Sequence, residues 1–353
     1  MPGTVTPVKI GIHPMWQDDF AAVADEIAAL EALGLADVFV EEGYSFDAVS
    51  RLGYLAARTS SVRLLSGILP IFSRTPALTA MTAAGLDYVS GGRFVLGLGT
   101  SGPQVIEGFH GVPYDAPVQR TREVIEICRE VWRREPLSYA GRHYTLPLPP
   151  DQGMGVGKPL KMINRPLRAD IPISIASIGL RNVELTAEVA NAWQPIFLMP
   201  EKVGDVWGGA LAAGASRRAP ALGPLETHTS VPTYVGDDWE DVIDGERPHI
   251  ALYVGGMGVR GKNYYNELAR RYGFEAEAAV IQDLYLAGRK DEAAAAVPSE
   301  LLRATTLIGS RSYVRDRLEV YREAGVSTVL AMPMVRTPEG RRDAVEALLE
   351  LTS

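Results

Sequence analysis

The sequence predicts an α/β fold, a (β/α)8 TIM barrel with insertions in its βα loops. Short apolar runs of strand length alternate with stretches of helical period along the chain, as in parallel strands joined by helices. Eight such strand and helix units follow one another, the number that closes a barrel. The 353 residues exceed the ~250 typical of one barrel but fall short of two average domains with a linker. We therefore expect a single domain over residues 1–353.

The predicted strands are the apolar runs. They span residues 8–12, 36–42, 62–69, 93–99, 171–177, 193–198, 226–236 and 326–333. The run at 93–99, RFVLGLG, is apolar on both faces, as expected of a strand that is covered on both sides in a parallel sheet. Thr75 and Pro76 predict the start of the helix after the third strand, and Gly91 and Gly92 predict its end.

Two segments interrupt the alternation and are predicted to be insertions. Residues 136–170 contain SYAGRHYTLP, typical of a short hairpin, followed by the glycine-rich and polar DQGMGVGKPLK. Residues 241–302 have a helical pattern. An open doubly wound sheet is the alternative fold, but it predicts a glycine-rich dinucleotide turn after the first strand. The chain has GIHPMWQDD there, with Gly11 alone.

Composition excludes several classes of function. The net charge of -8 and the absence of a long basic tract disfavour nucleic acid as a partner. No apolar stretch reaches the ~18 residues of a membrane helix, and the start of the chain lacks the pattern of a signal peptide. Cys128 is the single cysteine, so it forms no internal disulfide. We expect it to lie on the apolar side of a helix and to pack in the protein core. We expect a cytoplasmic protein that acts on a small molecule.

Candidate functional residues follow from the predicted fold, because the active site of a barrel lies at the carboxyl ends of its strands. His13 and Trp16 follow the first strand, and Glu41, Glu42 and Tyr44 follow the second. The candidates in or after strands three, four and five are Ser66, Gly67, Ile68, Gly99, Thr100, Ser101, Gly102, Ser177, Ile178 and Gly179.

Glycines and a helix start at this rim suit an elongated cofactor that carries phosphate. Around Gly99 and Gly102, backbone N–H groups and hydroxyls can face a ligand. The segment 177–179 opens a helix, whose unpaired N–H groups attract phosphate. Gly67 interrupts a buried strand, which indicates a bulge or the close approach of a ligand. Tight βα turns are the alternative explanation for these glycines.

Among the polar side chains, Glu42 beside Tyr44 is the best candidate for an acid or a hydrogen-bond donor, and an ordinary loop glutamate is the alternative. His13 suits proton transfer if it faces the ligand, or it plugs the barrel mouth together with Trp16. The five histidines show no metal-ligand spacing, so no metal site is predicted. No G-x-S-x-G nucleophile elbow is present.

Several long segments carry a resemblance to a known family. They are GGRFVLGLGTSGPQVIEGFHG, KPLKMINRPLRADIPISIASIGLRNVELTAEVANAWQPIF and HIALYVGGMG. They resemble the luciferase-like superfamily of oxidoreductases, particularly its deazaflavin branch, which depends on coenzyme F420. The similarity covers almost the whole chain, in order.

The resemblance implies a (β/α)8 barrel, often dimeric, that binds coenzyme F420 at the strand ends. It places a non-prolyl cis peptide at Gly67-Ile68, behind the deazaflavin ring. The acidic residue after strand two matches Glu41 or Glu42. The loop 99–102 and the turn 177–179 match the family's cofactor-binding segments.

The activity implied by the resemblance is hydride transfer between the deazaflavin C5 and a small organic substrate, with Glu42, His13 or Tyr44 handling the proton. An FMN-dependent monooxygenase and a non-catalytic flavin-binding barrel stay open as alternatives. Family members that oxidise sugar phosphates have a histidine beside the strand-two acid and a glutamate directly after the strand-four glycine turn. This chain has Gly43 and Pro103 there, which argues against a sugar phosphate substrate and its proton relay.

Overall fold

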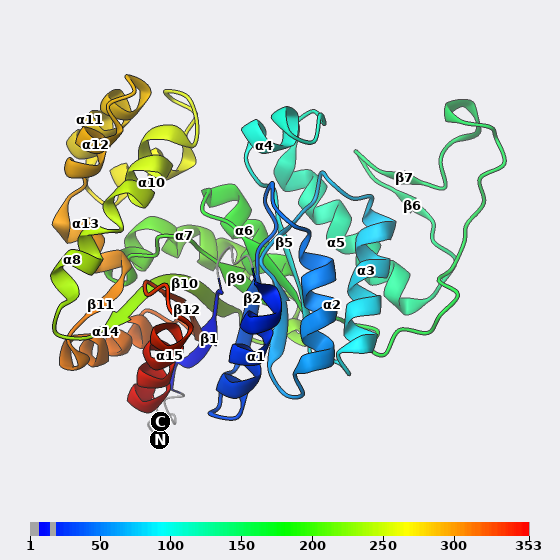
Figure 1. Cartoon of the computed structure of the whole chain (residues 1–353). Coiled ribbons are helices and arrows are strands. Elements are labelled where there is room, and N and C mark those ends of the chain that lie inside the picture. The colour runs from blue at the N-terminus through cyan, green and yellow to red at the C-terminus, as the bar shows by residue number, and fades with distance from the viewer. Residues whose placement is uncertain (1–6, 15–18, 353) are drawn as a thin grey trace.

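The structure is a computed structural model that describes residues 7–14 and 19–352. Eight parallel strands close into a barrel in the order β10, β12, β1, β2, β3, β5, β8, β9 and back to β10 (Figure 1). They are β1 Lys9–Ile12, β2 Asp37–Val40, β3 Arg63–Ser66, β5 Phe94–Gly99, β8 Ile173–Ala176, β9 Ala192–Gln194, β10 Glu226–Val235 and β12 Thr328–Pro333. Each lies within, or within one residue of, a predicted apolar run, so the predicted barrel is confirmed.

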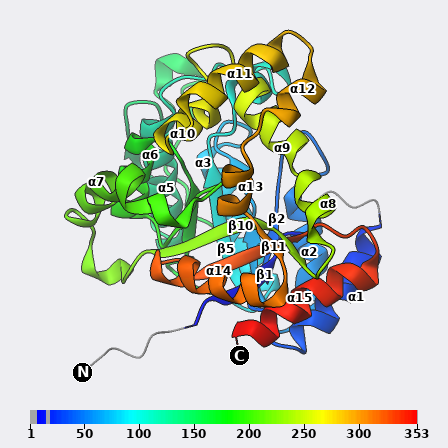
Figure 2. The same cartoon turned by 90° about the vertical axis from the view of Figure 1, so that its left-hand side faces the viewer.

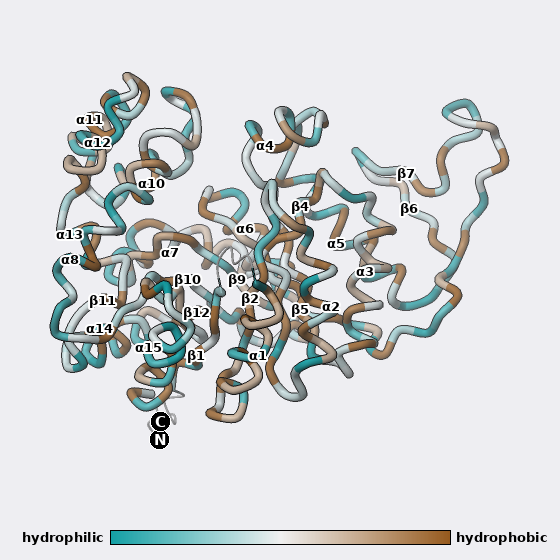
Figure 3. The backbone as a smooth tube through the Cα atoms, viewed as in Figure 1, coloured by the Kyte–Doolittle hydropathy of each residue, from teal (hydrophilic) through white to brown (hydrophobic). Residues whose placement is uncertain are grey.

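Helices surround the barrel, and in Figure 3 their colour changes between brown and teal along each helix, because one face packs on the strands and the other meets water. The helices around the barrel are α1 Phe20–Glu31, α2 Ala48–Arg58, α3 Pro76–Val89, α4 Pro103–Gly108, α5 Pro117–Arg133, α6 Leu180–Val189, α7 Val203–Ala215, α14 Arg311–Glu323 and α15 Pro338–Thr352. As predicted, Thr75 caps α3 and accepts a hydrogen bond from Leu78 N at 3.2 Å. Cys128 is buried in α5, and burial raises the pKa of its thiol to about 12.

One strand and one helix were not predicted between residues 302 and 326. There β11 Leu307–Gly309 pairs with the second half of β10, outside the closed ring, and α14 follows it. A strand of three residues is too short to show a period in the sequence. Among the described residues, no helix combines the length and the apolar character that a membrane crossing requires.

Two segments project from the barrel. Residues 136–170 form the predicted hairpin, β6 Tyr139–Ala140 with β7 Thr145–Leu146, and a long loop at the right of Figure 1. The second segment, which we call the cap, rises along the left side of Figure 1, and its helices α10, α11 and α12 lie at the top of Figures 1 and 2. The cap contains α8 Trp239–Asp244, α9 Arg247–Ala251, a π-helical turn Leu252–Gly256, α10 Tyr264–Arg271, α11 Glu275–Leu286, α12 Lys290–Ala295 and α13 Ser299–Thr305.

The strand register decides which side chains enter the barrel. Arg63 on β3 contacts both Asp37 on β2 and Glu226 on β10, which lies four strands away around the ring. These three side chains therefore cross the interior. Because side chains alternate along a strand, Phe39 and Glu41 point inward like Asp37, whereas Glu42 points outward.

Candidate active site at the carboxyl end of the barrel

A chain of hydrogen bonds joins three inward-facing side chains where the strands end. His13 follows β1, and its Nε2 lies 3.1 Å from the Glu41 carboxylate. Its Nδ1 lies 3.2 Å from the hydroxyl of Ser230 on β10. The ring also packs edge-on against Phe39, with 4.7 Å between centroids. The predicted candidate His13 is thus held between a carboxylate and a hydroxyl, an arrangement that suits proton transfer.

Glu41 is the carboxylate that stays charged at this site. Its side chain is buried, and Arg51 Nη1 lies 3.3 Å from its second oxygen. Burial alone would raise the pKa of Glu41, but the hydrogen bond with His13 and the charges of His13 and Arg51 hold it below its ordinary value. An ionised Glu41 accepts hydrogen bonds and would stabilise a positive charge on the imidazole.

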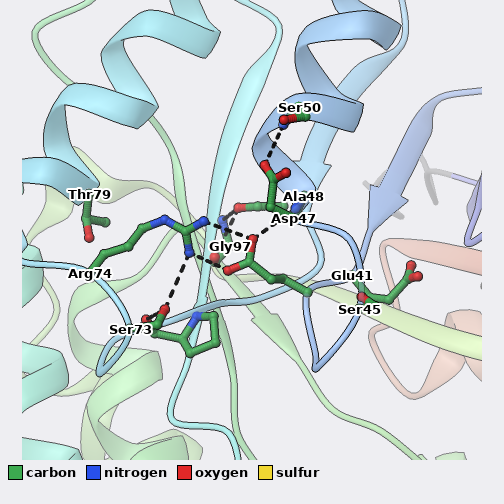
Figure 4. Close-up of polar contacts among 12 residues, drawn as sticks. Glu41, Ser45, Asp47, Ala48, Ser50, Ser73, Arg74, Thr79 and Gly97 are labelled. Carbon is green, nitrogen blue, oxygen red and sulfur yellow. Dashed lines mark hydrogen bonds and ion pairs between the residues drawn. The ribbon is translucent and has the colours of Figure 1, made fainter. Parts of the chain in front are cut away.

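Glu42, the other candidate acid, points to the opposite side. Its carboxylate pairs with the Arg74 guanidinium and accepts a hydrogen bond of 2.9 Å from Ala48 N, the first residue of α2. Figure 4 shows Arg74 and Asp47 gathered on one side and Glu41 turned away from them. These contacts anchor the loop between β2 and α2, and they leave Glu42 without a direct link to His13.

Tyr44 lies in the same loop and is 71% exposed. Its ring is 6.3 Å from that of Phe109, which follows α4, so the two aromatic side chains come from neighbouring rim loops. Trp16, the other aromatic candidate at the rim, lies outside the described residues.

The third strand contains the predicted bulge. Leu65 pairs with Val95 of β5, whereas Leu69 of the short strand β4 Leu69–Pro70 pairs with Leu98, so the third strand has one extra residue. The hydroxyl of Ser66 fills the gap, since it accepts from Gly97 N at 2.7 Å and donates to Gly97 O at 3.0 Å. The Ser66 side chain therefore holds the bulge together.

Gly67 and Gly99 are required by close neighbours within the protein. A Cβ on Gly67 would collide with the backbone of Glu41, so the close approach inferred from the sequence is made by the adjacent strand. A Cβ on Gly99 would meet the Ile68 side chain at 2.6 Å. The resemblance implied a cis peptide at Gly67-Ile68, and this expectation is wrong: the cis bond found among the described residues is Leu146-Pro147.

The loop after β5 holds the next candidates, Thr100, Ser101 and Gly102. Ser101 has a left-handed backbone with φ of 54°, which is uncommon outside glycine and occurs often at binding sites. Tyr114 donates a hydrogen bond of 3.4 Å to its carbonyl. Gly102 then caps the short helix α4 without a side-chain hydrogen bond.

The turn after β8 presents backbone rather than side chains. The Ser177 hydroxyl is buried and bonds to the Thr186 hydroxyl at 2.9 Å, and the Ile178 carbonyl accepts from Trp207 Nε1 at 2.9 Å. Gly179 caps α6, has open space where a Cβ would lie, and has no side-chain cap. What this turn offers to a phosphate is therefore the N–H groups that begin α6.

Sequence reasoning missed Ser230 and Gln194. Gln194 ends β9, pairs with Ala176 and is buried, yet neither polar atom of its amide has a hydrogen-bond partner in the described structure. A buried amide without partners is costly, so a ligand or an ordered water that bonded to it would lower that cost. Inward alternation along β9 and β10 was the signal that could have identified both residues.

Among the described residues, no three histidine, cysteine, aspartate or glutamate side chains gather as a metal site would require.

Comparison with known proteins identifies the family. The model of the luciferase-like monooxygenase family matches residues 1–328. A protein of Mycobacterium tuberculosis, provisionally named a coenzyme F420-dependent oxidoreductase, is 40% identical over 87% of this chain and 89% of its own length. The 5,10-methylenetetrahydromethanopterin reductase of Archaeoglobus fulgidus is 26% identical over 80% of each chain.

Solved structures agree on the fold. The F420-dependent tetrahydromethanopterin reductase of Methanopyrus kandleri superimposes with a TM-score of 0.80 at 21% identity, covering 98% of each chain. An F420-dependent secondary alcohol dehydrogenase, in complex with an F420-acetone adduct, gives a TM-score of 0.76 at 15% identity over 99% of each chain. The chain belongs to the luciferase-like monooxygenase family, a family of (β/α)8-barrel enzymes.

Proposed function

We propose that this enzyme is a coenzyme F420-dependent oxidoreductase that transfers hydride to or from a small organic substrate. The relative at 40% identity supports the choice of cofactor. The observation that carries the proposal is the pairing of a proton-holding chain, Glu41, His13 and Ser230, with an unpartnered buried amide, Gln194, at one end of the barrel.

The residues present fit a deazaflavin. The pyrimidine edge of such a ring alternates carbonyl and N–H groups, which an amide such as Gln194 complements. Ala176, at the end of β8 and paired with Gln194, is a small residue that would leave room for the ring. The bulge at Gly67 and Ile68 would support the ring, and the loop 99–102 and the start of α6 would hold the phosphate-bearing tail.

When bound, the cofactor supplies or accepts hydride at its C5, because a deazaflavin favours two-electron transfer. Reduction of a carbonyl group places the hydride on carbon and a proton on oxygen, and oxidation of an alcohol reverses both transfers. His13 holds that proton, and Ser230 relays it between Nδ1 and the substrate oxygen. Glu41 orients the ring and stabilises its charged form. The hydrogen bond with His13 supports Glu41 over Glu42 for this role, and the exposed Tyr44 ring would contact substrate.

The test is a fluorescence titration of the full chain with F420 and with FMN. We expect saturable binding of one F420 per chain, and FMN binding at least about 10-fold weaker. Gln194→Ala should weaken F420 binding about 10-fold, consistent with the loss of a hydrogen bond to a buried group. Gln282→Ala is the matched control, since Gln282 is also buried with an unpartnered Nε2 but lies in the cap.

Each alternative predicts a different result. Tighter binding of FMN would favour a monooxygenase. Tight F420 binding without turnover of any enone, alcohol, imine or nitro compound, followed by the absorbance of F420, would favour a non-catalytic barrel.

Dimer formation and a cytoplasmic location belong to the same proposal. The outer face of α3 exposes Leu78, Met81, Tyr88 and Val89 at helical spacing, an apolar stripe that a second copy of the chain can cover. Light scattering should give the mass of two chains, and Met81→Asp should shift it towards one. A single species of one chain in the wild type would contradict a dimer. The buried, unpaired Cys128 suits a reducing compartment.

A further inference from the structure

Four aromatic rings form one surface where the cap meets the end of β9. They are Phe197, three residues after β9, together with His249, Tyr253 and Tyr265 of the cap, and we call them the aromatic wall. Tyr253 is central: its ring centroid lies 5.0 Å from that of Phe197, 4.9 Å from His249 and 4.7 Å from Tyr265. The interplanar angles of 73° to 87° are typical of edge-to-face contacts.

The aromatic wall faces the rim loops that follow β2 and β5. Burial raises the pKa of Tyr253, and the nearby Tyr44 phenol and Glu246 carboxylate raise it further. Burial likewise raises the pKa of Tyr265, and the nearby phenols of Tyr253 and Tyr114 raise it further. Phe197 follows the carboxyl end of β9 and its ring contacts those of Tyr253 and Tyr265, so the wall lies at the mouth of the barrel. All four wall residues are only partly buried, so each presents some surface.

Two uncommon backbone conformations hold the wall in place, a π-helical turn and a left-handed residue. Tyr253 lies in the π-helical turn, whose carbonyls at Tyr253 and Val254 accept hydrogen bonds of 2.9 and 3.0 Å from the Asn263 amide. Phe197 has a φ of 51°, a strained value for a non-glycine residue, and Tyr272 donates a hydrogen bond of 2.9 Å to its carbonyl. Both π-helical turns and strained residues concentrate at functional sites.

The two phenols of the wall carry no charge. A phenol is protonated at pH 7 at its ordinary pKa, and a raised pKa keeps it so, and therefore both phenols can donate hydrogen bonds. His249 Nδ1 is bound to the buried Glu246 carboxylate at 2.9 Å, and its Nε2 has no partner in the described part of the chain.

The arginines of the nearby rim are already paired. Arg51 contacts Glu41, Arg74 contacts Glu42 and Arg120 contacts Asp115. All three lie in or just before the first turn of a helix that follows a barrel strand. An anionic substrate would therefore lack a spare cation among them.

We propose that the aromatic wall is the substrate subsite, and that the substrate is an uncharged ketone or enone that carries a flat aromatic or other apolar group. The rings pack against the flat group, and the phenol and imidazole donors reach the carbonyl oxygen. A cavity of about 20 Å³ adjoins the wall, and its lining, which includes Phe197, Tyr265, Ile250 and Leu268, is apolar. This inference rests on the proposed function and adds the substrate class.

The test compares two ligands of the same shape, 2-acetylnaphthalene and its carboxylated analogue 6-acetyl-2-naphthoate. Calorimetry with the full chain should give at least 30-fold tighter binding of the neutral ketone, with and without F420 present. Equal or tighter binding of the carboxylate would overturn the proposal, and this comparison needs no variant.

Variants locate the subsite. Tyr253→Ala should weaken binding of 2-acetylnaphthalene at least 10-fold, and Tyr253→Phe less than 3-fold, with F420 affinity unchanged in both. Tyr54→Ala, on α2 outside the mouth, is the control and should change nothing. If the Tyr253→Ala variant unfolds at a lower temperature than the wild type, Tyr253→Leu tests the loss of the aromatic ring with the side-chain volume largely kept. Unchanged ketone binding in the folded variants would refute the wall as the subsite.

The two proposals fail separately. Ketone binding that depends on Tyr253, without any F420 binding, would leave the subsite and remove the cofactor. F420 binding without preference for the neutral ketone would leave the cofactor and remove the substrate class.

Discussion

The two ends of the barrel interior each contain a glutamate paired with a histidine, but the pairs are built differently. At the amino end, Glu226 lies 2.7 Å from His228 and 3.1 Å from Arg63, which also holds the fully buried Asp37. At the carboxyl end, Glu41 lies 3.1 Å from His13, which reaches the hydroxyl of Ser230.

The same residue types stabilise the fold at the amino end and, as we propose, transfer a proton at the carboxyl end. His228 is sealed in the barrel, whereas His13 keeps about 13% of its side chain exposed, and the unpartnered Gln194 amide lies on the same rim. At the amino end the ion pairs span the barrel and include the fully buried Asp37, whereas at the carboxyl end the histidine links a carboxylate to a hydroxyl. Mutations at the two ends should therefore affect different measurements.

The largest expected effect comes from replacing each histidine with asparagine in turn. His13→Asn should lower kcat/KM by about 10²- to 10³-fold, the usual contribution of a general acid or base, with F420 affinity and Tm nearly unchanged. His228→Asn should leave kcat/KM within about 3-fold. Steady-state kinetics on both variants, with circular dichroism melts, checks the contrast, and equal losses of activity would contradict it.

Arg63→Met tests the ion network at the amino end of the barrel. It removes the cation beside Asp37, whose side chain has no exposed surface, so an uncompensated charge is left inside the barrel. Unfolding free energy should fall by about 3 kcal/mol. Urea unfolding followed by tryptophan fluorescence measures it. The control Arg311→Met removes an exposed pair with Glu350 and should change the unfolding free energy by less than about 1 kcal/mol.

Adjacent carboxylates provide a finer test. Glu41→Gln should lower kcat about 10- to 100-fold, because His13 loses the charge that stabilises its protonated form. Glu42→Gln, which weakens the pair with Arg74, should lower Tm and change kcat less than about 3-fold. The opposite order of kcat values would return the catalytic role to Glu42.

The smallest expected effect is a pH dependence of stability from Glu226. The hydrogen bond with His228 comes first among the causes that lower its pKa to about 2, followed by the charge of Arg63 against the opposing effect of burial. A lowered folded pKa gives stability that is present above the unfolded value near 4.5 and is lost as pH falls towards 2. More than a third of this side chain is exposed, so we expect only about 1–2 kcal/mol.

Urea unfolding of the wild type and Glu226→Gln at pH 6, 4 and 2.5 measures this effect. The stability advantage of the wild type should shrink over that series. An advantage that is constant with pH would rule out the assigned ionisation.

The spacing of apolar residues and the residues that begin or end helices were sufficient to predict the barrel. Each strand is a short apolar run, and Thr75 and Gly91 mark helix ends. The site was harder to predict. Glu41 and Glu42 are adjacent and identical in type, and only the register of β2 against β1 and β3 assigns one to the interior. Gly67 signalled a close approach without identifying the partner, which is the backbone of Glu41.

Residues far apart in sequence complete the site, and for Ser230 the sign in the sequence was limited to its inward position along β10. Ser230 lies 217 residues from His13 and meets it only because β10 and β1 both flank β12. Phe197 joins Tyr253 of the cap in the same way. Tertiary packing, rather than local propensity, creates both contacts: strand pairing for Ser230 and the docking of the cap for Phe197.

A crystal structure of the full chain with bound F420 tests the central claim most directly. We predict the deazaflavin ring at the carboxyl end of the barrel, on the bulge at Gly67 and Ile68, with its pyrimidine edge on the Gln194 amide and its C5 open towards His13 and Tyr253. A ring bound elsewhere, or one whose C5 faces away from His13, would contradict the account.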